Sequence, residues 1–555
     1  MSGSMHGGGA RYVLVKKPEA EARQLEFRYF GPSDAPPGNL ILYVDIRERR
    51  ISSRRIEHFD ADAVIQETDE GTPQLYEKIW PGLPPAGHED EHLIRLGRAM
   101  ANNHASGWHR PDWSNLPAAY TYFGQFIAHD ISHLDWVKKG EDSFDAVTPA
   151  LDLSSLFGHP DRPLRSGKSL VGETSTGSRR DLARFPCGRP DVADTRNDAN
   201  LGLSQIHVLI ALFHEALINR FGLSDADARL ETKRHLQYVV LNDYLPRIVG
   251  RELVEEILRH GRALFNPPVF FTPVEFSAAA FQFGHAMIRH SYAPWKADGL
   301  PASPTNLMQI TYVGGDLESN ASEERAIPGD WLMPWDHMLP QDVGNGATIH
   351  AAVVTSRMAA ELGEVDPMFV QFPLGMNINT PEAPKLLKVN LAAQTLLRCK
   401  VLEIADAQVI ATVAQVTLSA STVPRIPIPT LTPDELIAAL DLSSGGLRNL
   451  LEVEFPHFLT GTPLWLYTLL EARHHNATGH LGPLAGRIIA ETLHAAIASD
   501  PDSILVNCLN LETVWPKRVS QGRDFDLWAM WSIAMSEQAT RGDRQDELDH
   551  RLHAL

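Results

Sequence analysis

The stretch "AYTYFGQFIAHDISHLDW", residues 119–136, places polar and ionisable side chains inside an otherwise apolar and aromatic segment. If the stretch is a helix, Gln125 and His129 are four positions apart and share one face, whereas Asp130 points roughly 100° away from them. Two interpretations are open. Either the helix directs a polar pair into a cavity and a carboxylate towards a second site, or it is a partly exposed helix with ordinary polar residues.

A hydrolytic metal site formed by His129, Asp130 and His133 is a third interpretation. It is disfavoured because no HExxH motif occurs near these residues. The segment "FHEALIN", residues 213–219, begins like a zinc signature but lacks the second histidine that a zinc site needs.

The composition is that of an ordinary soluble globular protein. The chain has 555 residues, of which 43% are hydrophobic and 21% charged, and this length permits about two to four domains. Its net charge of −19 argues against nucleic acid or an anionic membrane as the main partner. Cys187, Cys399 and Cys508 form no CxxC motif and predict neither a zinc site nor a disulfide framework, which favours a reducing compartment.

Neither a targeting signal nor a membrane-spanning segment is expected. Residues 1–17 have no apolar core of the kind found in secretory signals. The longest apolar run, "VLIALF" at 208–213, is too short to cross a bilayer. We therefore expect a cytoplasmic protein by default, with leaderless secretion as the alternative.

Apolar residues with the 3.6-residue period of helices recur from residue 93 onward. They predict a mainly α fold with little β structure, in which a large single helical domain at 91–555 follows a partly irregular N-terminal arm at 1–90. The arm contains one strand-like segment, "NLILYVDI", and "QVIATVAQVTL" at 408–418 fits either a strand or a helix. The expected helices cover residues 92–102, 203–221, 231–245, 251–261, 273–290, 383–400 and 482–498.

A second motif, "TPALDLSSLFG" at 148–158, contains a run of oxygen donors without nitrogen or sulfur ligands. Thr148, Asp152 and Ser154 alternate with backbone carbonyls, which is the chemistry that Ca²⁺ prefers. Asp130 could complete such a site from the preceding helix. A local turn stabilised by Asp and Ser side chains explains the same residues, and both readings are open here.

Three further segments each contain one candidate residue within or next to an apolar stretch. Arg196 lies in "DTRNDAN" just before a strongly apolar helix, His285 in "FQFGHAMIRHSY", and Asn390 in "KLLKVNLAAQ". A single histidine in an apolar helix is usually a histidine of the core, so none of these residues identifies a function by itself. His104, His109, His133, His207, His214 and His290 are assigned no function.

Taken together and in order, these motifs resemble those of the animal-type haem peroxidases (the peroxidase–cyclooxygenase superfamily), and most closely its bacterial members. The resemblance implies that Gln125 and His129 lie on the distal side of a haem and that Arg196 is catalytic. On the other side, His285 would be the axial ligand of the haem iron, and its ring would donate a hydrogen bond to Asn390.

The resemblance extends over about residues 90–500 and includes "GTPLWLYTLLEAR" and "HLGPLAGRIIAETL" near the C-terminus. It also implies a calcium site beside the distal helix. The implied calcium ligands are the side chains of Asp130, Thr148, Asp152 and Ser154 and the carbonyl oxygen of Ala150.

Two positions depart from the pattern of the family. Much of the family has an Asp directly before the distal histidine and a Glu three residues after the catalytic arginine, and both form ester bonds to the haem. Here these positions are Ala128 and Ala199, which have no side-chain oxygen. We therefore expect a haem b that is bound without covalent bonds.

The activity that the resemblance implies is that of a peroxidase active in the response to oxidative stress. It would reduce H₂O₂ through a ferryl intermediate and oxidise a small donor such as a phenol or a halide. A fatty-acid dioxygenase is disfavoured because the tyrosine radical site of those enzymes corresponds here to Gln282, and many mammalian-type peroxidases have an arginine at that position, which puts efficient halide oxidation in doubt. A haem-binding pseudoenzyme is a further alternative.

Overall fold

The computed structural model shows a mainly helical protein. It describes residues 11–14, 24–30, 40–45, 50–55, 76–101, 113–132, 150–159, 162–163, 170–185, 188, 190–267, 270–297, 299–309, 326–340, 348–363, 365, 390–440, 445–475, 479–506 and 525–536. Helices make up 58% and strands 6% of the structure, which confirms the predicted fold class.

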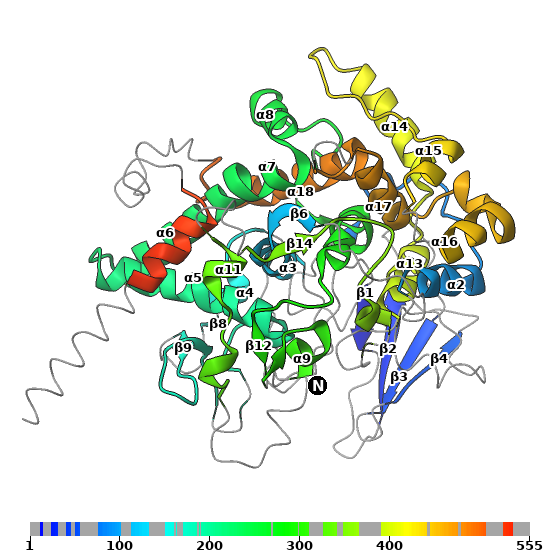
Figure 1. The fold of residues 1–555 in the computed structure, drawn as a ribbon. Helices are drawn as coiled ribbons and strands as arrows, with labels where there is room; N and C mark the ends of the chain where they lie inside the picture. The colour runs from blue at the N-terminus through cyan, green and yellow to red at the C-terminus, as the bar shows by residue number, and fades with distance from the viewer. Residues whose placement is uncertain are drawn as a thin grey trace, which may run out of the picture.

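Most of the fold consists of α-helices (Figure 1). The labelled helices are α2 (Asp90–Met100), α3 (Ala119–Ile131), α4 (Ser154–Phe157), α5 (Leu201–Asn219), α6 (Asp225–Val239), α7 (Leu245–Val249), α8 (Arg251–His260), α9 (Pro304–Gln309), α11 (Trp335–Met338), α13 (Leu391–Val401), α14 (Ala407–Ser419), α15 (Pro433–Ala438), α16 (Gly445–Asn449), α17 (Leu464–His474) and α18 (Pro483–Ser499). A further helix near the C-terminus is Leu527–Ser536. Three π-helical segments are η2 (Val240–Tyr244), η3 (Glu275–Ala279) and η7 (Leu450–Glu454). The 3₁₀ segments are η1 (Thr195–Asp198), η4 (Ala280–Met287), η5 (Gly329–Trp331), η6 (Ala360–Gly363) and η8 (Pro456–Leu459).

The N-terminal arm contains more β structure than the sequence suggested. Four strands, β1 (Arg11–Leu14), β2 (Gln24–Phe30), β3 (Leu40–Asp45) and β4 (Arg50–Arg55), pair in order as an antiparallel sheet. The sequence predicted only one strand, "NLILYVDI", and this was wrong. Short strands have a weak periodic signal of their own and are stabilised by pairing with other segments, which a local pattern does not show. In Figure 1 this sheet lies below α2 and α13. The domain boundary at residue 90 stays a prediction.

The remaining strands are two to five residues long and pair locally or across the helical domain. The antiparallel pairs are β6 (Trp113–Pro117) with β14 (His350–Ala352), β7 (Gly158–His159) with β8 (Arg162–Pro163), β9 (Val171–Gly172) with β10 (Asp181–Leu182), and β12 (Lys296–Ala297) with β13 (Leu300–Pro301). The parallel pair is β5 (Tyr76–Glu77) with β11 (Thr272–Pro273).

Helix α5 forms the centre of the hydrophobic core. Almost every residue from Leu201 to Leu217 is buried, because the segment is apolar on all sides rather than on one stripe. Its first turn is capped by Asn200, whose side chain accepts a hydrogen bond from the N–H of Leu203. By length and composition α5 could also cross a membrane, but 89% of its apolar window is buried inside the protein.

The opening stretch is a buried helix and not a partly exposed one. Eleven of the thirteen residues of α3 are buried, and only Gln125 and Ala128 are partly exposed. Helix α3 packs against α5 on one side and against η4 on another. The close approach to α5 depends on Gly202, since a side chain there would overlap the ring of Tyr122.

Two other predicted helices differ in detail. The segment 273–290 is not a regular α-helix but the π-helical η3 followed by the 3₁₀ segment η4. The ambiguous segment 408–418 is helical and lies within α14. In the stretch predicted from 383 to 400, the described helix α13 begins at Leu391.

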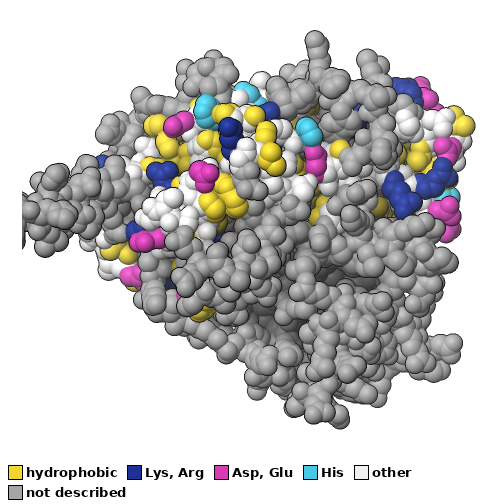
Figure 2. Space-filling view, turned by 60° about the horizontal axis from the view of Figure 1, so that its bottom comes forward, with side chains coloured by type: hydrophobic (Ala, Val, Ile, Leu, Met, Phe, Trp, Pro, Cys, Tyr) yellow, Lys and Arg dark blue, Asp and Glu magenta, His cyan; other side chains and the backbone are white. Residues whose placement is uncertain are grey.

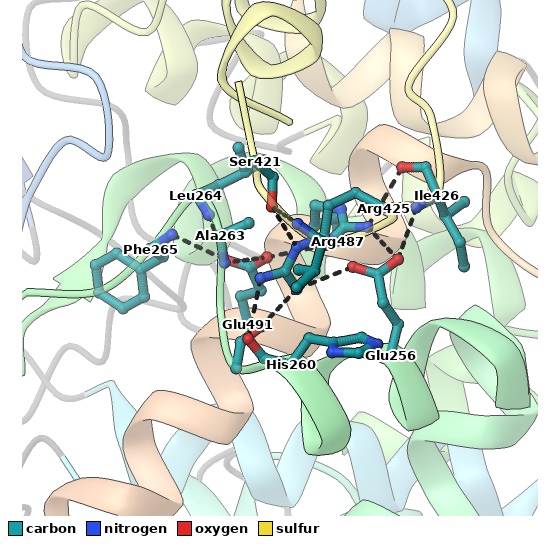
Figure 3. A network of polar contacts seen from close by, with 12 residues as sticks. Glu256, His260, Ala263, Leu264, Phe265, Ser421, Arg425, Ile426, Arg487 and Glu491 are labelled. Carbon is teal, nitrogen blue, oxygen red and sulfur yellow. Dashed lines mark hydrogen bonds and ion pairs between the residues drawn. The ribbon is translucent and has the colours of Figure 1, made fainter. Parts of the chain in front are cut away.

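Buried ion pairs join α8, α18 and the segment after α14 (Figure 3). Arg487 of α18 donates to Glu256 of α8 at 2.9 Å and to Glu491 of its own helix at 3.1 Å. Arg425, which follows α14, also donates to Glu256 at 3.1 Å. The carboxylate of Glu491 accepts hydrogen bonds from the N–H groups of Ala263, Leu264 and Phe265. The network therefore fixes α8, α18 and the segment after α14 relative to one another.

The described part of the surface carries both signs of charge. On the face shown in Figure 2, Lys and Arg side chains are interspersed with Asp, Glu and apolar side chains. A binding surface for nucleic acid would need clustered cations. That nucleic acid is not the main partner stays a prediction.

Candidate active site

The predicted pair Gln125 and His129 lies on α3, and both side chains are held by the segment just before α5. The Nδ1 of His129, which is fully buried, lies 2.9 Å from Oδ1 of Asn197. The Oε1 of Gln125 accepts a hydrogen bond of 3.0 Å from Nδ2 of Asn200. Both residues of the shared helix face are therefore oriented by side chains of "DTRNDAN".

Arg196 lies against the C-terminal end of α3, directly beside His129. Its Nη2 donates to the carbonyl oxygen of His129 at 2.8 Å, and its Nη1 donates to that of Ser132 at 2.7 Å. The last carbonyl groups of an α-helix cannot be satisfied by N–H groups of the helix itself, so the guanidinium caps the end of α3. The same guanidinium forms an ion pair with Asp194 at 2.6 Å.

Asp130 points away from His129 into a second polar site, as the spacing on a helix predicts. Its carboxylate, which is fully buried, accepts hydrogen bonds from the N–H groups of Leu153 at 2.9 Å and Ser155 at 3.0 Å. Burial and the nearby charge of Asp152 raise the pKa of Asp130 to about 7. Two carboxylates from separate segments thus meet in a poorly solvated place.

The predicted calcium ligands are only partly visible in this structure. Asp130, Ala150, Asp152 and Ser154 are described, whereas Thr148 lies outside the described residues. Asp152 accepts a hydrogen bond from the N–H of Ser154 at 2.9 Å. In the part of the chain that is described, no group of three or more His, Cys, Asp or Glu side chains could hold a metal ion. The predicted set contains two such side chains, and its other members are hydroxyl and carbonyl groups.

His285 lies on η4 in an apolar environment. Its ring contacts the edge of Trp465, with ring centroids 6.4 Å apart, and its Nδ1 is buried without a hydrogen-bond partner. Burial, together with the charge of Arg398, lowers the pKa of His285 to about 3. The imidazole is therefore neutral at ordinary pH, which is the form that binds a metal.

Asn390 does not partner His285 in this structure. Its side-chain Oδ1 accepts a hydrogen bond from the N–H of Ala393 at 2.9 Å, so Asn390 is the N-cap of α13. The residue lies directly before the helix and not within it. The hydrogen bond between His285 and Asn390 that the resemblance implies is not made.

The elements that carry His129 and His285 pack against each other. Tyr244 of η2 contacts both elements, with its ring centroid 5.6 Å from that of Phe123 on α3 and 6.4 Å from that of Phe281 on η4. Gly124 permits this contact, because a Cβ there would lie 2.4 Å from the hydroxyl of Tyr244. The fold thus brings together two histidine-bearing segments that are far apart in the sequence.

The positions that depart from the family pattern flank this site. Ala128 directly precedes His129 on α3, and Ala199 follows η1. Both are partly exposed, and neither has a side-chain oxygen. His133 lies outside the described residues, so the structure does not test a hydrolytic metal site formed by His129, Asp130 and His133.

Sequence analysis missed three residues of the site: Asn197, Asn200 and His207. Asn200 had a local signal, since Asn is favoured directly before an apolar helix. Asn197 and His207 had none, because their contacts depend on how α3, η1 and α5 pack. Of the cysteines, Cys399 is free and buried, and Cys187 and Cys508 lie outside the described residues.

Comparison with known proteins agrees with the motifs. Residues 135–313 match the model of the animal haem peroxidase family. This match confirms the resemblance to that family. The matched segment contains Arg196 and His285, whereas His129 and Asn390 lie outside it. No curated protein matches the chain. The bacterial assignment stays a prediction.

Solved structures with related folds include a peroxidase and two dioxygenases. Peroxidase A from Dictyostelium discoideum is 14% identical, with 82% of this chain and 94% of that chain covered and a TM-score of 0.49. Fatty acid alpha-dioxygenase from Oryza sativa is 13% identical, covering 83% of this chain and 80% of that one, with a TM-score of 0.45. The enzyme from Arabidopsis thaliana is 14% identical, with 83% and 76% covered and a TM-score of 0.46.

Proposed function

We propose that the protein is a haem-dependent peroxidase that reduces hydrogen peroxide and oxidises a small donor such as a phenol or a halide. One observation carries this proposal: α3, with the buried His129, packs against η4, with His285, and Arg196 lies beside His129. A distal acid–base group, a cation and a neutral histidine on a second element are the protein groups that peroxide reduction at a haem needs.

The environment of His285 fits the role of an axial ligand. The ring is neutral, and its buried Nδ1 has no partner within the protein. When bound, haem supplies a redox-active iron at which peroxide is reduced. We assign no partner to Nδ1, since Asn390 caps α13 instead.

On the distal side, His129 acts as the proton carrier. An imidazole can take the proton from one oxygen of hydrogen peroxide and return it to the other as the O–O bond breaks. The permanent charge of Arg196 stabilises negative charge that develops nearby, and its capping of α3 also fixes the backbone of His129. Gln125 can donate a hydrogen bond to peroxide or water through its amide.

The haem is held without ester bonds, since Ala128 and Ala199 cannot form them. Acidified organic solvent should therefore extract all of the haem from the denatured protein. Haem that stays with the polypeptide after extraction would contradict this part of the proposal.

The site of Asp130 binds calcium, with Thr148, Asp152, Ser154 and the carbonyl of Ala150 as the other ligands. The support is the buried approach of Asp130 and Asp152, whose mutual repulsion a divalent cation would relieve. Calcium should raise the thermal midpoint of the wild-type protein and leave that of Asp152→Asn unchanged. Asp330→Asn, at an exposed position, is the control. Equal responses of wild type and Asp152→Asn would count against the site.

The decisive experiment for the proposed function records the absorption spectrum of the haem-loaded protein before and after one equivalent of hydrogen peroxide, and then adds a phenolic dye. A fast spectral change followed by dye oxidation supports a peroxidase. Bound haem without either change identifies a pseudoenzyme. Oxygen consumption with a fatty acid would identify a dioxygenase, although Gln282, at the position of the dioxygenase tyrosine, is buried and donates to the carbonyl of Ser277 at 2.7 Å.

A further inference from the structure

We propose that Asn197 is a positioning residue that fixes the orientation and the tautomer of His129, with His207 holding the other end of the Asn197 amide. The inference rests on the proposed function, in which His129 carries the proton of peroxide. It assigns roles to two residues whose types and spacing predicted none.

The side chains of His129, Asn197 and His207 form a buried hydrogen-bonded chain that joins three elements. His129 belongs to α3, Asn197 to η1 and His207 to α5, and their exposed fractions are 0%, 0% and 1%. Asn197 Oδ1 lies 2.9 Å from Nδ1 of His129, and its Nδ2 lies 3.0 Å from Nδ1 of His207. Since bulk water does not reach these groups, a lost contact would leave a buried polar atom unpaired.

The direction of each hydrogen bond follows from a backbone carbonyl. Nδ2 of Asn197 also lies 3.5 Å from the carbonyl oxygen of Ser155, which can only accept. The NH₂ group of the amide therefore faces Ser155 and His207, and the amide oxygen faces His129. That oxygen can only accept, so Nδ1 of His129 carries a proton and donates it.

His207 has the state that this arrangement requires. The Asn197 NH₂ group can only donate, so Nδ1 of His207 must be an unprotonated acceptor. Burial lowers the pKa of His207 to about 4, although the charge of Asp194 partly opposes this, and the ring is neutral at ordinary pH. The edge of Phe126, also on α3, contacts the ring of His207 with centroids 6.1 Å apart.

This hydrogen-bond pattern decides which nitrogen of His129 can do chemistry. With the proton of the neutral ring on Nδ1, Nε2 is the basic nitrogen that can take a proton from peroxide. When Nε2 is protonated, Nδ1 still donates to Asn197, so the same contact serves both states of the ring. The opposite tautomer would set a lone pair of Nδ1 against the amide oxygen.

The segment 194–200, which contains Asn197, also orients Gln125 through a side-chain amide. Three residues after Asn197, the amide of Asn200 donates through Nδ2 to Oε1 of Gln125 at 3.0 Å, while its Oδ1 caps α5 at the N–H of Leu203. Oε1 of Gln125 is thus engaged, and its NH₂ group is the donor left for a ligand. The side-chain amides of Asn197 and Asn200 therefore decide which atoms of His129 and Gln125 donate hydrogen bonds and which accept them.

The test combines kinetics with a direct measurement of the tautomer. In Asn197→Ala, the rate constant for the reaction of the haem-loaded enzyme with peroxide should fall about 10- to 100-fold, with haem affinity unchanged. The loss should nearly vanish when His129→Ala is already present, because Asn197 acts through His129. Asn242→Ala, which removes an amide bonded to a carbonyl of its own helix, is the control and should keep the wild-type rate.

Nitrogen-15 NMR of full-length protein labelled at histidine reads the tautomers independently of activity. The wild type should show a protonated Nδ1 and an unprotonated Nε2 for His129, and the reverse for His207, with assignments from His129→Ala and His207→Gln. Asn197→Ala should give a mixture of tautomers at His129. The spectrum of the wild type tests the inference even if the variant fails to fold.

The outcomes separate this inference from the proposed function. If the wild type is active and Asn197→Ala reacts with peroxide at the same rate, the positioning role is wrong. It is also wrong if Asn197→Ala lowers the rate equally with and without His129. The opposite tautomer of His129 in the wild type would overturn it as well. A wild type that binds haem but does not react with peroxide would refute the proposed function, while the NMR spectrum would still decide the tautomer.

Discussion

At the scale of single residues, the surroundings of His129 and His285 differ. The ring of His129 is anchored through Nδ1 to Asn197, and its backbone carbonyl accepts from Arg196. His285 has no hydrogen bond at Nδ1, and its neutral ring is surrounded by apolar groups such as Trp465. An anchored acid–base group and a neutral, unpartnered imidazole suit different tasks at one cofactor.

Replacing His129 should impair the chemistry and not the binding of haem. We expect His129→Ala to slow the reaction with hydrogen peroxide by about 10²–10⁴-fold, because it removes the general acid–base group. Stopped-flow absorbance measures the rate, and the haem absorption band measures binding. His290→Ala is the control, since His290 is exposed. A His129→Ala enzyme that reacts at the wild-type rate would rule out the assigned role.

Replacing His285 should have the opposite effect. We expect His285→Ala to lose haem or to bind it much more weakly, because no other group is assigned to hold the iron. Titration of the haem-free variant with haem, followed by absorbance, measures the affinity, and circular dichroism checks that the helices are intact. Wild-type affinity in a folded His285→Ala protein would show that His285 is not the axial ligand.

At the scale of secondary-structure elements, close contacts between helices depend on individual small residues. Helices α2 and α13 lie side by side (Figure 1). A Cβ at Gly97 of α2 would lie 2.2 Å from the backbone nitrogen and 2.3 Å from the Cα of Ala393. Since these are backbone atoms, they cannot yield by rotation of a side chain. The glycine thus sets the distance between the two helices.

Gly97→Ala should therefore destabilise the protein. We expect the free energy of unfolding to fall by about 1–3 kcal/mol, the usual cost of overpacking, with a lower thermal midpoint as the measurement. The matched control is Gly446→Ala in α16, where nothing lies within 4 Å of the new Cβ. The control should leave the midpoint unchanged or raise it, because alanine favours helices. Equal midpoints for Gly97→Ala and wild type would contradict the packing argument.

At the scale of the whole molecule, the buried ion pairs of Figure 3 connect segments that are more than 160 residues apart in the sequence. Burial raises the pKa of Glu256, but the hydrogen bonds from Arg487, the N–H of Ile426 and Arg425 outweigh it, and the pKa of Glu256 lies below its usual value of 4.5. A carboxyl group with a lowered pKa in the folded state stabilises the fold above pH 4.5. This contribution is lost as the pH falls through the lowered pKa.

Arg487→Ala should destabilise the protein by about 3–5 kcal/mol, because it removes the cation from the buried Glu491 and one of the two cations that pair with Glu256. The control is Arg448→Ala, whose partner Glu452 is 41% exposed and whose ion pair contributes at most about 0.5 kcal/mol. Thermal midpoints at pH 7 and pH 4 measure both effects. The wild type should lose stability towards pH 4. Arg487→Ala should lose less, because without Arg487 the pKa of Glu256 is lowered only by Arg425 and the N–H of Ile426. Identical pH responses would contradict the role of the network.

The local pattern of apolar residues predicted most regular helices, whereas elements that depend on tertiary packing were not predicted. The period of apolar residues was sufficient for α2, α5, α8 and α18, since a helix that buries its apolar side chains shows this in its own sequence. It was not sufficient for η3 and η4, where the chain departs from regular α geometry. The period of apolar residues also did not predict the sheet formed by β1–β4, because strand pairing depends on contacts between separate segments of the chain.

The sequence by itself determined the helical character of the chain, the apolar core helix, and the candidate residues Gln125, His129, Asp130, Arg196 and His285. The helical character and the core helix follow from residue types and their spacing, whereas the candidate residues follow from the order of motifs that resemble one family. Only the tertiary structure decided that Asn197 joins His129 to His207, that Arg196 caps α3, and that Asn390 caps α13 and leaves His285 without a partner. Hydrogen bonds between segments depend on distances of a few tenths of an ångström, which are set by the packing of α3, η1 and α5 and leave no periodic trace in the chain.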